Sequence, residues 1–399
     1  MPIVSRSAMV TRSECTRLRV LEYHWCGRGL RRKARALPLI DGVYMHKALE
    51  ALLLSGRAHD HAHNQAMCDT IMAEIRPAYA DEARAAGIAN DDGDLELLIA
   101  EQLCLLEGAL RTWAYQRLPA LLEEYEPIAV EQEFSWQLSE ARDIVQPLRM
   151  DCLMERRDDR LLHILDFKTA SYPGMTWARK FEHDEQTLSY TLAAQETFHR
   201  PIGGLIYEGL VVGQRKRDTA KSSPFYGLRV QNSPYCYGYK FDGPIPVYQT
   251  EYTAKKGWRK VRAWEEMTPK EWFETVLLPE HRLTGSFQTL FVVNPPLLPT
   301  PREQEEWREE TLRQEVRLFR NLDELASAQV ADLRHGTTHE QERVLREHFP
   351  KNRARCFKFG EDHVCGMYDM CWNETVAEDP LGSGLYEWRE DHHAIKEDL

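Results

Sequence analysis

The chain has 399 residues, a formal net charge of −12 and an apolar fraction of 43%. This length and composition exclude a disordered chain and allow about two to three domains with a sizeable core. No apolar run reaches the roughly 18–20 residues that span a bilayer, and the first residues hold no apolar core of the signal-peptide kind. We therefore expect a cytoplasmic protein without a membrane span.

The first predicted elements are helices. Residues 41–56 carry apolar side chains at helical spacing and end at Gly56, and residues 57–125 continue as helix. The strongest helical stretch is LELLIAEQLCLLEGALRTWAYQRLPALLEEY. We expect residues 1–126 to form an N-terminal helical region.

After Pro127 the pattern changes to that of strands. The runs IAVEQEFSWQL, LRMDCLMER and RLLHILDFKT are alternating or mostly apolar, and RRDD separates the last two as a turn. A helix is expected from about Asp184 to Phe198, followed by another strand in GGLIYEGLVVG. This order predicts an α/β core over residues 127–300, with a mixed central sheet flanked by helices.

The remaining segments differ from this core. Residues 213–262 carry Gly, Pro, Ser and Tyr between short alternating runs, which predicts antiparallel strands or a long hairpin inserted into the core. Residues 301–348 return to helix, in a C-terminal segment (301–399) that also holds a cysteine cluster and an acidic tail. The expected apolar stripe of this helix is too short and irregular for a coiled coil. Its members are Leu312, Val316, Phe319, Ala326 and Val330.

The run LDFKTAS ends one of the predicted strands with an acid and a lysine. Asp166 and Lys168 are two residues apart on that strand, so both side chains point to the same face. Asp151 lies on the preceding strand, and a hairpin would bring its carboxylate close to Asp166. Carboxylates hold Mg²⁺ or Mn²⁺ for attack on a phosphate, and a lysine offsets charge in the transition state. Glu133, on the strand before, could supply a further acid.

Two helical motifs lie on either side of these strands. Gln186 and Tyr190 are at positions i and i+4, on one face of the helix that follows the lysine strand. In the first predicted helix, Gly42, His46 and Glu50 are also spaced by four. A lone histidine at such a position can equally be a packed or a capping residue.

The order of these motifs resembles the RecB-like branch of the PD-(D/E)XK nucleases. The order is G-x-x-x-H on a helix, an acid-bearing strand, an aspartate, D-x-K and then Q-x-x-x-Y, over roughly residues 42–212. No single motif is specific, but the ordered set is. The resemblance implies a restriction-endonuclease-like α/β core. Family members often have Glu where this chain has Asp166.

The resemblance also implies a role for each motif residue. Asp151 and Asp166 would bind the metal ion, and Lys168 would be the catalytic lysine. His46 would be a metal ligand or a phosphate contact. The residues that would orient the DNA or the lysine are Gln186 and Tyr190.

The nine cysteines are unevenly placed. Their odd number, in a chain without an export signal, argues against a disulfide framework. Cys356, Cys365 and Cys371 cluster near the C-terminus, and Cys26 stands alone near the N-terminus. Four thiolates can hold zinc or an iron–sulfur cluster, and no CxxC knuckle of the structural zinc type occurs. His363 is the substitute ligand if one cysteine is not used.

One cysteine before the core and three after it resemble the iron–sulfur nucleases of the RecB-like group. These include AddB-type helicase–nucleases and CRISPR-associated adaptation exonucleases, and the resemblance implies a [4Fe–4S] cluster that fastens the two chain ends together. The gap of five residues between Cys365 and Cys371 matches that pattern, whereas the gap of eight between Cys356 and Cys365 is longer than usual. We expect the other cysteines to be ordinary thiols, namely Cys15, Cys68, Cys104, Cys152 and Cys236.

Basic residues gather in RGLRRKAR, QRKR, KKGWRKVR and KNRARCFK. Each cluster alone can be a solvated face, but four of them in an acidic chain suggest a basic channel for DNA phosphates. The residues that we expect to contact nucleic acid are Arg28, Arg31, Arg32, Arg215, Lys216, Arg217, Arg353 and Arg355.

These patterns together predict a metal-dependent DNA nuclease with a structural [4Fe–4S] cluster. The resemblance favours an exonuclease acting on single strands or ends. Because the chain has no G-x-x-x-x-G-K-[ST] motif, it would work without ATP or beside a separate helicase, recombinase or CRISPR adaptation protein. The alternatives are a non-catalytic DNA-end-binding or scaffold protein that keeps the nuclease fold, and a zinc-stapled structural protein.

Overall fold

The computed structural model describes residues 4–33, 37–86, 95–139, 144–170, 177–211, 291–357 and 365–389. Between residues 212 and 290 it describes only short strands and residue 270. Among the described helices, none combines the length and apolar character needed to cross a membrane.

A five-stranded mixed sheet forms the centre of the molecule, in the order β12–β5–β4–β3–β2. β2, β3 and β4 form an antiparallel meander, β5 lies parallel to β4, and β12 is antiparallel to β5. Helix α7 provides the crossover that the parallel step from β4 to β5 requires. The strands are β2 (Tyr125–Ser139), β3 (Ile144–Arg156), β4 (Leu162–Ala170), β5 (Ile202–Val211) and β12 (Phe291–Val293).

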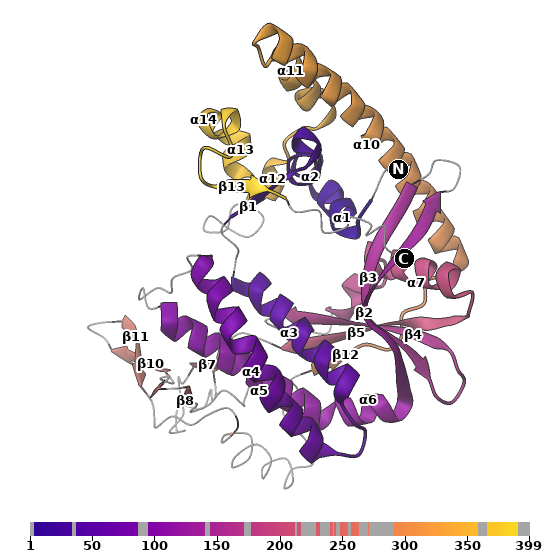
Figure 1. Cartoon of the computed structure of the whole chain (residues 1–399), viewed down its shortest axis with the longest axis vertical. Coiled ribbons are helices and arrows are strands. Elements are labelled where there is room, and N and C mark those ends of the chain that lie inside the picture. The colour runs from indigo at the N-terminus through magenta and orange to yellow at the C-terminus, as the bar shows by residue number, and fades with distance from the viewer. Residues whose placement is uncertain are drawn as a thin grey trace.

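Helices cover both faces of this sheet (Figure 1). Because side chains alternate along a strand, Leu165 and Phe167 of β4 pack with α3, α4 and α5, whereas Leu162 and Ile164 pack with α7. The mixed sheet between helices confirms the α/β class expected from the sequence. The helices are α3 (Leu37–Ser55), α4 (His61–Ala85), α5 (Leu95–Gln116), α6 (Leu118–Glu124), the 3₁₀ turn η3 (Ala178–Phe181) and α7 (Glu185–Phe198).

The two ends of the chain pack together in a unit that we call the terminal lobe, residues 4–33, 353–357 and 365–389. In Figure 1 the indigo N-terminal helices lie beside the yellow C-terminal elements. Leu30 pairs with Trp388 in a small antiparallel sheet, and Leu18, Met367 and Tyr386 are buried in a core of the lobe's own. Its elements are α1 (Arg6–Glu14), α2 (Thr16–Tyr23), η1 (Trp25–Gly27), β1 (Leu30–Arg32), α12 (Arg353–Cys356), α13 (Tyr368–Trp372), α14 (Glu374–Glu378) and β13 (Tyr386–Trp388).

Two helices connect the sheet to this lobe, α10 (Pro301–His335) and α11 (His339–His348). The predicted stripe of α10 is correct in its first half, where it packs against the sheet and α7. It is wrong in its second half, because Ala326 and Val330 are exposed. There α10 packs instead on α2 and α11, so a different set of residues is buried, namely Leu318, Leu325 and Ala328.

The predicted insertion is described only in part. Its described strands lie in three antiparallel pairs, β6 with β7, β8 with β9 and β10 with β11, and the rest of 213–262 lies outside the described residues. The bounds are β6 (Gln214–Lys216), β7 (Arg229–Gln231), β8 (Lys240–Phe241), β9 (Gly243–Pro244), β10 (Tyr248–Thr253) and β11 (Gly257–Arg262). The acidic tail, 390–399, also lies outside the described residues.

Candidate active site

The site begins where strands β3 and β4 separate. Their ladder runs from the turn to the pair Cys152–Leu165, and Asp151 and Asp166 are the next residue on each strand. Beyond that pair, Oδ2 of Asp151 accepts the backbone N–H of Phe167 at 2.7 Å. The predicted hairpin is therefore present, and it brings the two aspartates to the same point of the sheet.

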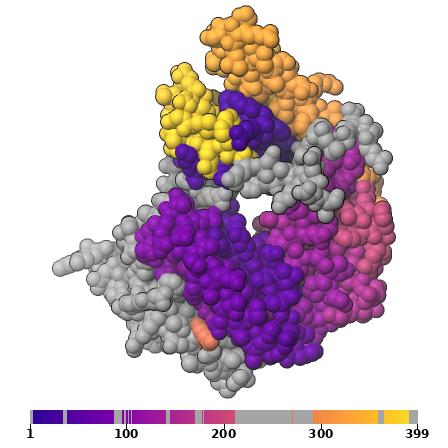
Figure 2. All heavy atoms as spheres, viewed as in Figure 1, coloured from indigo at the N-terminus to yellow at the C-terminus, as the bar shows by residue number. Residues whose placement is uncertain are grey.

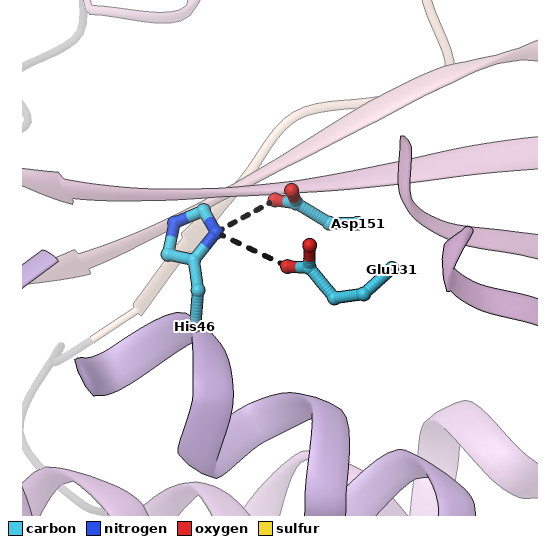
Figure 3. A group of neighbouring side chains, drawn as sticks. All are labelled: His46, Glu131 and Asp151. Carbon is cyan, nitrogen blue, oxygen red and sulfur yellow. Dashed lines mark ion pairs between the residues drawn. The ribbon is translucent and has the colours of Figure 1, made fainter. Parts of the chain in front are cut away.

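Helix α3 adds a histidine to this point. His46 Nδ1 lies 3.3 Å from Oδ2 of Asp151 and 3.7 Å from Oε1 of Glu131 (Figure 3). In the described part of the chain, these three residues form the one group of His, Cys, Asp and Glu whose ligand atoms all lie within 4.8 Å of one another. Two carboxylates and an imidazole nitrogen are a donor set that can hold a divalent cation.

Glu131 is the acid of β2 that completes this group. It lies between Val130, which pairs with Cys152, and Gln132, which pairs with Met150, so it stands opposite Asp151. Its backbone has a φ of 49°, in the left-handed region that non-glycine residues seldom adopt. Two like charges opposite each other on neighbouring strands repel. The carboxylates of Glu131 and Asp151 therefore need a positive charge between them.

The electrostatics of the site agree with this conclusion. Burial alone would lower the pKa of His46, but its hydrogen bonds to Asp151 and Glu131 raise it to about 10. Burial alone would raise the pKa of Asp151, but His46 and Lys168 hold it below its usual value. The site thus favours a positive charge beside Asp151, and a divalent metal bound there would supply that charge in place of the proton on His46.

The lysine half of the site lies on β4 and α7. Lys168 Nζ forms an ion pair with Oδ2 of Asp166, and Gln186 Nε2 donates a hydrogen bond to Oδ1 of the same carboxylate. Burial raises the pKa of Asp166, and the Lys168 ammonium opposes that effect. Tyr190, one turn after Gln186, donates to the backbone carbonyl of Arg149 at 2.9 Å. The Q-x-x-x-Y face of α7 therefore contacts both Asp166 and the strand that carries Asp151.

These residues line one pocket of about 810 Å³ between the core and the terminal lobe. In Figure 2 an opening is visible between the indigo and purple helices and the magenta strands. Glu133, the acid named from the sequence, is exposed and also lines the pocket. The lobe and α10 contribute cationic and aromatic side chains, namely Arg6, Arg19, Tyr23, His24, Phe319 and Arg389.

The structure divides the predicted DNA-contacting residues into two kinds. Arg28 is exposed and lines the catalytic pocket, and the guanidinium of Arg353 lies over the ring of the exposed Trp372. Three others take part in ion pairs that hold the lobe together, Arg31 with Glu387, Arg32 with Asp369 and Arg355 with Glu14. The side chains of Arg215 and Lys216, and the whole of Arg217, lie outside the described residues.

The cysteines meet in the terminal lobe. Cys356, Cys365 and Cys371 line one small pocket, and the fourth cysteine in it is Cys15, between α1 and α2. Cys26 does not line this pocket and is exposed in η1. Among the described residues, no three of these cysteines have all their sulfur atoms within 4.8 Å of one another. His363, the substitute ligand, lies outside the described residues.

Two residues of these sites were missed by the sequence reasoning. Glu131 could have been found only from the register of β2 against β3, which is shifted by an irregularity between Pro127 and Ala129. The sequence predicts Cys15 to be an ordinary thiol, because no sequence pattern shows which N-terminal cysteine faces the three C-terminal cysteines.

A mixed sheet that gathers carboxylates, a histidine and a lysine in one pocket supplies the groups that metal-dependent hydrolysis of a phosphodiester uses. The model of the PD-(D/E)XK nuclease superfamily matches residues 4–274, which is more than half of the chain. The protein belongs to this superfamily of nucleases. A search among curated proteins found no match.

Proposed function

We propose that this protein is a DNA nuclease of the RecB-like type, which hydrolyses phosphodiester bonds in single strands or at DNA ends. The observation that carries the proposal is the joint placement of Asp151, Asp166 and Lys168 in one pocket. A pocket of this volume suits a segment of the size of a few nucleotides. Its enclosure by the terminal lobe therefore supports a single strand or an end as the substrate.

Each residue of the site has a task in this reaction. Asp151, Glu131 and His46 would hold a Mg²⁺ or Mn²⁺ ion, which when bound polarises the phosphoryl group and makes a water molecule more acidic. Asp166, which the resemblance implies as a metal ligand, also fixes the ammonium of Lys168, and Lys168 can hydrogen-bond the attacking water and offset the charge that develops on phosphate. Gln186 and Tyr190 keep Asp166 and β3 in place.

We also propose that the terminal lobe holds a [4Fe–4S] cluster. Its N-terminal ligand would be Cys15 and not Cys26, the cysteine that the resemblance implies. The support is the pocket that Cys15 shares with Cys356, Cys365 and Cys371. The resemblance to the iron–sulfur nucleases favours a cluster over zinc, and the four cysteines of this pocket would supply the thiolates that the cluster needs.

The test of catalysis is nucleotide release from end-labelled single- and double-stranded DNA, with Mg²⁺ or Mn²⁺ and with EDTA. We expect metal-dependent cleavage that the Asp166→Ala variant loses and that an exposed variant on the same chain, Arg302→Ala, keeps. The labelled end reports the polarity. An intact parent protein that binds DNA ends but releases no nucleotide would instead be the non-catalytic end-binding protein.

The test of the cluster is anaerobic purification with iron and sulfide analysis. We expect a brown protein whose visible absorbance is lost in Cys15→Ala and retained in Cys26→Ala. A colourless protein with bound zinc would overturn the cluster, and loss of absorbance only in Cys26→Ala would overturn the choice of Cys15.

A further inference from the structure

Arg6 is a cation of the catalytic pocket to which the proposed reaction assigns no task. It is the first residue of α1 and lines the pocket together with Asp151, Asp166 and Lys168. His46 and Glu131 approach the site from α3 and β2, whereas Arg6 lies near Asp184 and Gln186 at the start of α7. A phosphate in the pocket would therefore have a metal site on one side and Arg6 on the other.

The hydrogen-bonding capacity of Arg6 is largely unused. Its one ion pair in the described part of the chain joins Nη2 to Oδ1 of Asp184 at 3.4 Å, and its Nε is buried without a hydrogen-bond partner there. The same Oδ1 already accepts the backbone N–H of Gln186 at 2.7 Å, as the cap of α7. A guanidinium offers five N–H donors in a planar fork that matches two phosphate oxygens. Arg6 is thus a guanidinium with donors to spare in an enclosed pocket.

The position of Arg6 is fixed by the core of the molecule. Val4 donates its backbone N–H to the carbonyl of Val145 in β3 at 3.0 Å, and Val4 and Met9 are fully buried on either side of Arg6. Ser5 caps the helix by accepting the N–H of Ala8. The positive end of α1 therefore also faces the pocket, which favours an anion there.

We propose that Arg6 binds the reacting phosphate and stabilises the charge that it develops in the transition state. This inference rests on the proposed nuclease function and deepens it. Its ligand is a phosphodiester oxygen, which the free Nε and Nη donors of Arg6 recognise. Because the core holds the backbone of Arg6 beside the pocket, its guanidinium approaches the phosphate from a fixed point of the fold.

The experiment compares Arg6→Ala with Asp184→Asn in cleavage of a short single-stranded oligonucleotide. Asn is as good a helix cap as Asp, so Asp184→Asn keeps the start of α7 and removes only the negative charge that pairs with Arg6. We expect Arg6→Ala to lower kcat about 100-fold and also to weaken oligonucleotide binding, and millimolar guanidinium to restore part of kcat. Asp184→Asn should stay within about threefold of the parent, since the ion pair at 3.4 Å contributes little.

Three other results would contradict the proposed role of Arg6. Equal kcat values for the parent and Arg6→Ala would overturn it. An equal loss in Asp184→Asn, without rescue by guanidinium, would make Arg6 a structural residue. If the parent cleaves no DNA, the nuclease function itself fails, and oligonucleotide affinity then decides: equal affinities of parent and Arg6→Ala would overturn phosphate binding by Arg6.

Discussion

At the scale of single residues, two acids of β2, Glu131 and Glu133, are candidates for the ligand that this strand would give to the metal ion. Glu131 stands opposite Asp151 and beside His46, whereas Glu133 is exposed at the rim of the same pocket. We expect Glu131→Gln to weaken Mn²⁺ binding at least about tenfold, because it removes one charged ligand. Glu133→Gln should change it less than twofold. Calorimetric titration of both variants with Mn²⁺ checks this without any cleavage, and the reverse order of effects would restore Glu133 as the ligand.

A second residue-scale prediction concerns Asp41 of α3, which links α3 to α4. Burial raises the pKa of Asp41 to about 6, against the lowering effect of the hydrogen bond that Tyr79 donates at 2.6 Å. Since an unfolded aspartate titrates near pH 3.9, the folded state prefers the protonated acid, and stability is lost as the pH rises through 6.

The variant Asp41→Asn stays neutral and still accepts from Tyr79. We expect it to gain about 2 kcal/mol relative to the parent between pH 4 and pH 8, from the difference between the two pKa values. Urea unfolding of both proteins at these two pH values measures the change. A constant difference across the range would show that Asp41 is ionised throughout in the folded protein.

Part of the candidate site could be predicted from the sequence. The sequence could indicate that Asp151, Asp166 and Lys168 meet, because a tight hairpin and a period of two fix which strand positions come together. Glu131 and Cys15 were not found, for two physical reasons. A one-residue irregularity shifts the register of β2 against β3 and so decides which residue of β2 stands opposite Asp151. The partner of the C-terminal cysteines depends on how two distant chain ends pack, which no local pattern encodes.

At the scale of secondary-structure elements, a buried carboxylate joins the sheet to the helical layer. Glu208 of β5 is fully buried and accepts hydrogen bonds from Trp113 Nε1 at 2.8 Å and from Arg117 Nε at 3.1 Å. Removing it leaves a buried indole N–H and a partly buried guanidinium without an acceptor. We expect Glu208→Ala to destabilise the fold by about 3 kcal/mol.

Glu126→Ala is the matched control for this element-scale prediction. Glu126 pairs with Arg157 at the exposed end of β2, so its loss should change stability by less than about 0.5 kcal/mol. Denaturant midpoints of the two variants provide the comparison. Equal midpoints would mean that the hydrogen bonds of Glu208 are compensated by solvent and do not hold β5 to α5.

The sequence predicts best those helices and strands that pack against a single neighbouring layer along their whole length. β2 to β4, α3 and α7 each face the sheet or its core along their length, so a regular period marks the buried side. α10 was predicted as a helix, but its buried face changes at about Leu318, where its partner changes from the sheet to α2 and α11. A single stripe cannot describe a helix with two successive partners.

At the scale of the whole molecule, one buried carboxylate ties α10 to the N-terminal helices. Glu315 of α10 is fully buried and forms ion pairs with Arg12 of α1 and Arg19 of α2. Burial lowers the pKa of Arg19, and Glu315 opposes that effect, so the ion pair keeps a desolvated guanidinium charged. The attachment of α1 and α2, and hence the lobe wall of the catalytic pocket, depends on this carboxylate.

We expect Glu315→Ala to cost about 3–5 kcal/mol in the packing of α1 and α2 on α10, because it leaves two buried guanidinium groups without a counter-charge. Since Val4 and Met9 attach α1 to the sheet independently of α10, the core should stay folded while α2 loses its protection. Hydrogen exchange measures this directly: faster exchange in 16–23 with unchanged exchange in 162–170 is the expected pattern. Glu309→Ala, exposed on the same helix, is the control.

This variant also separates two roles of the terminal lobe in catalysis. If the lobe serves mainly to hold the strand, Glu315→Ala should raise KM about tenfold or more and leave kcat near the parent value, because Asp166 and Lys168 lie on the sheet and Val4 still attaches Arg6 to it. If kcat falls as far as in Arg6→Ala, then the position of Arg6 depends on α10 and not on Val4 and β3 alone. Unchanged exchange and unchanged kinetics together would contradict the dependence of the pocket wall on Glu315.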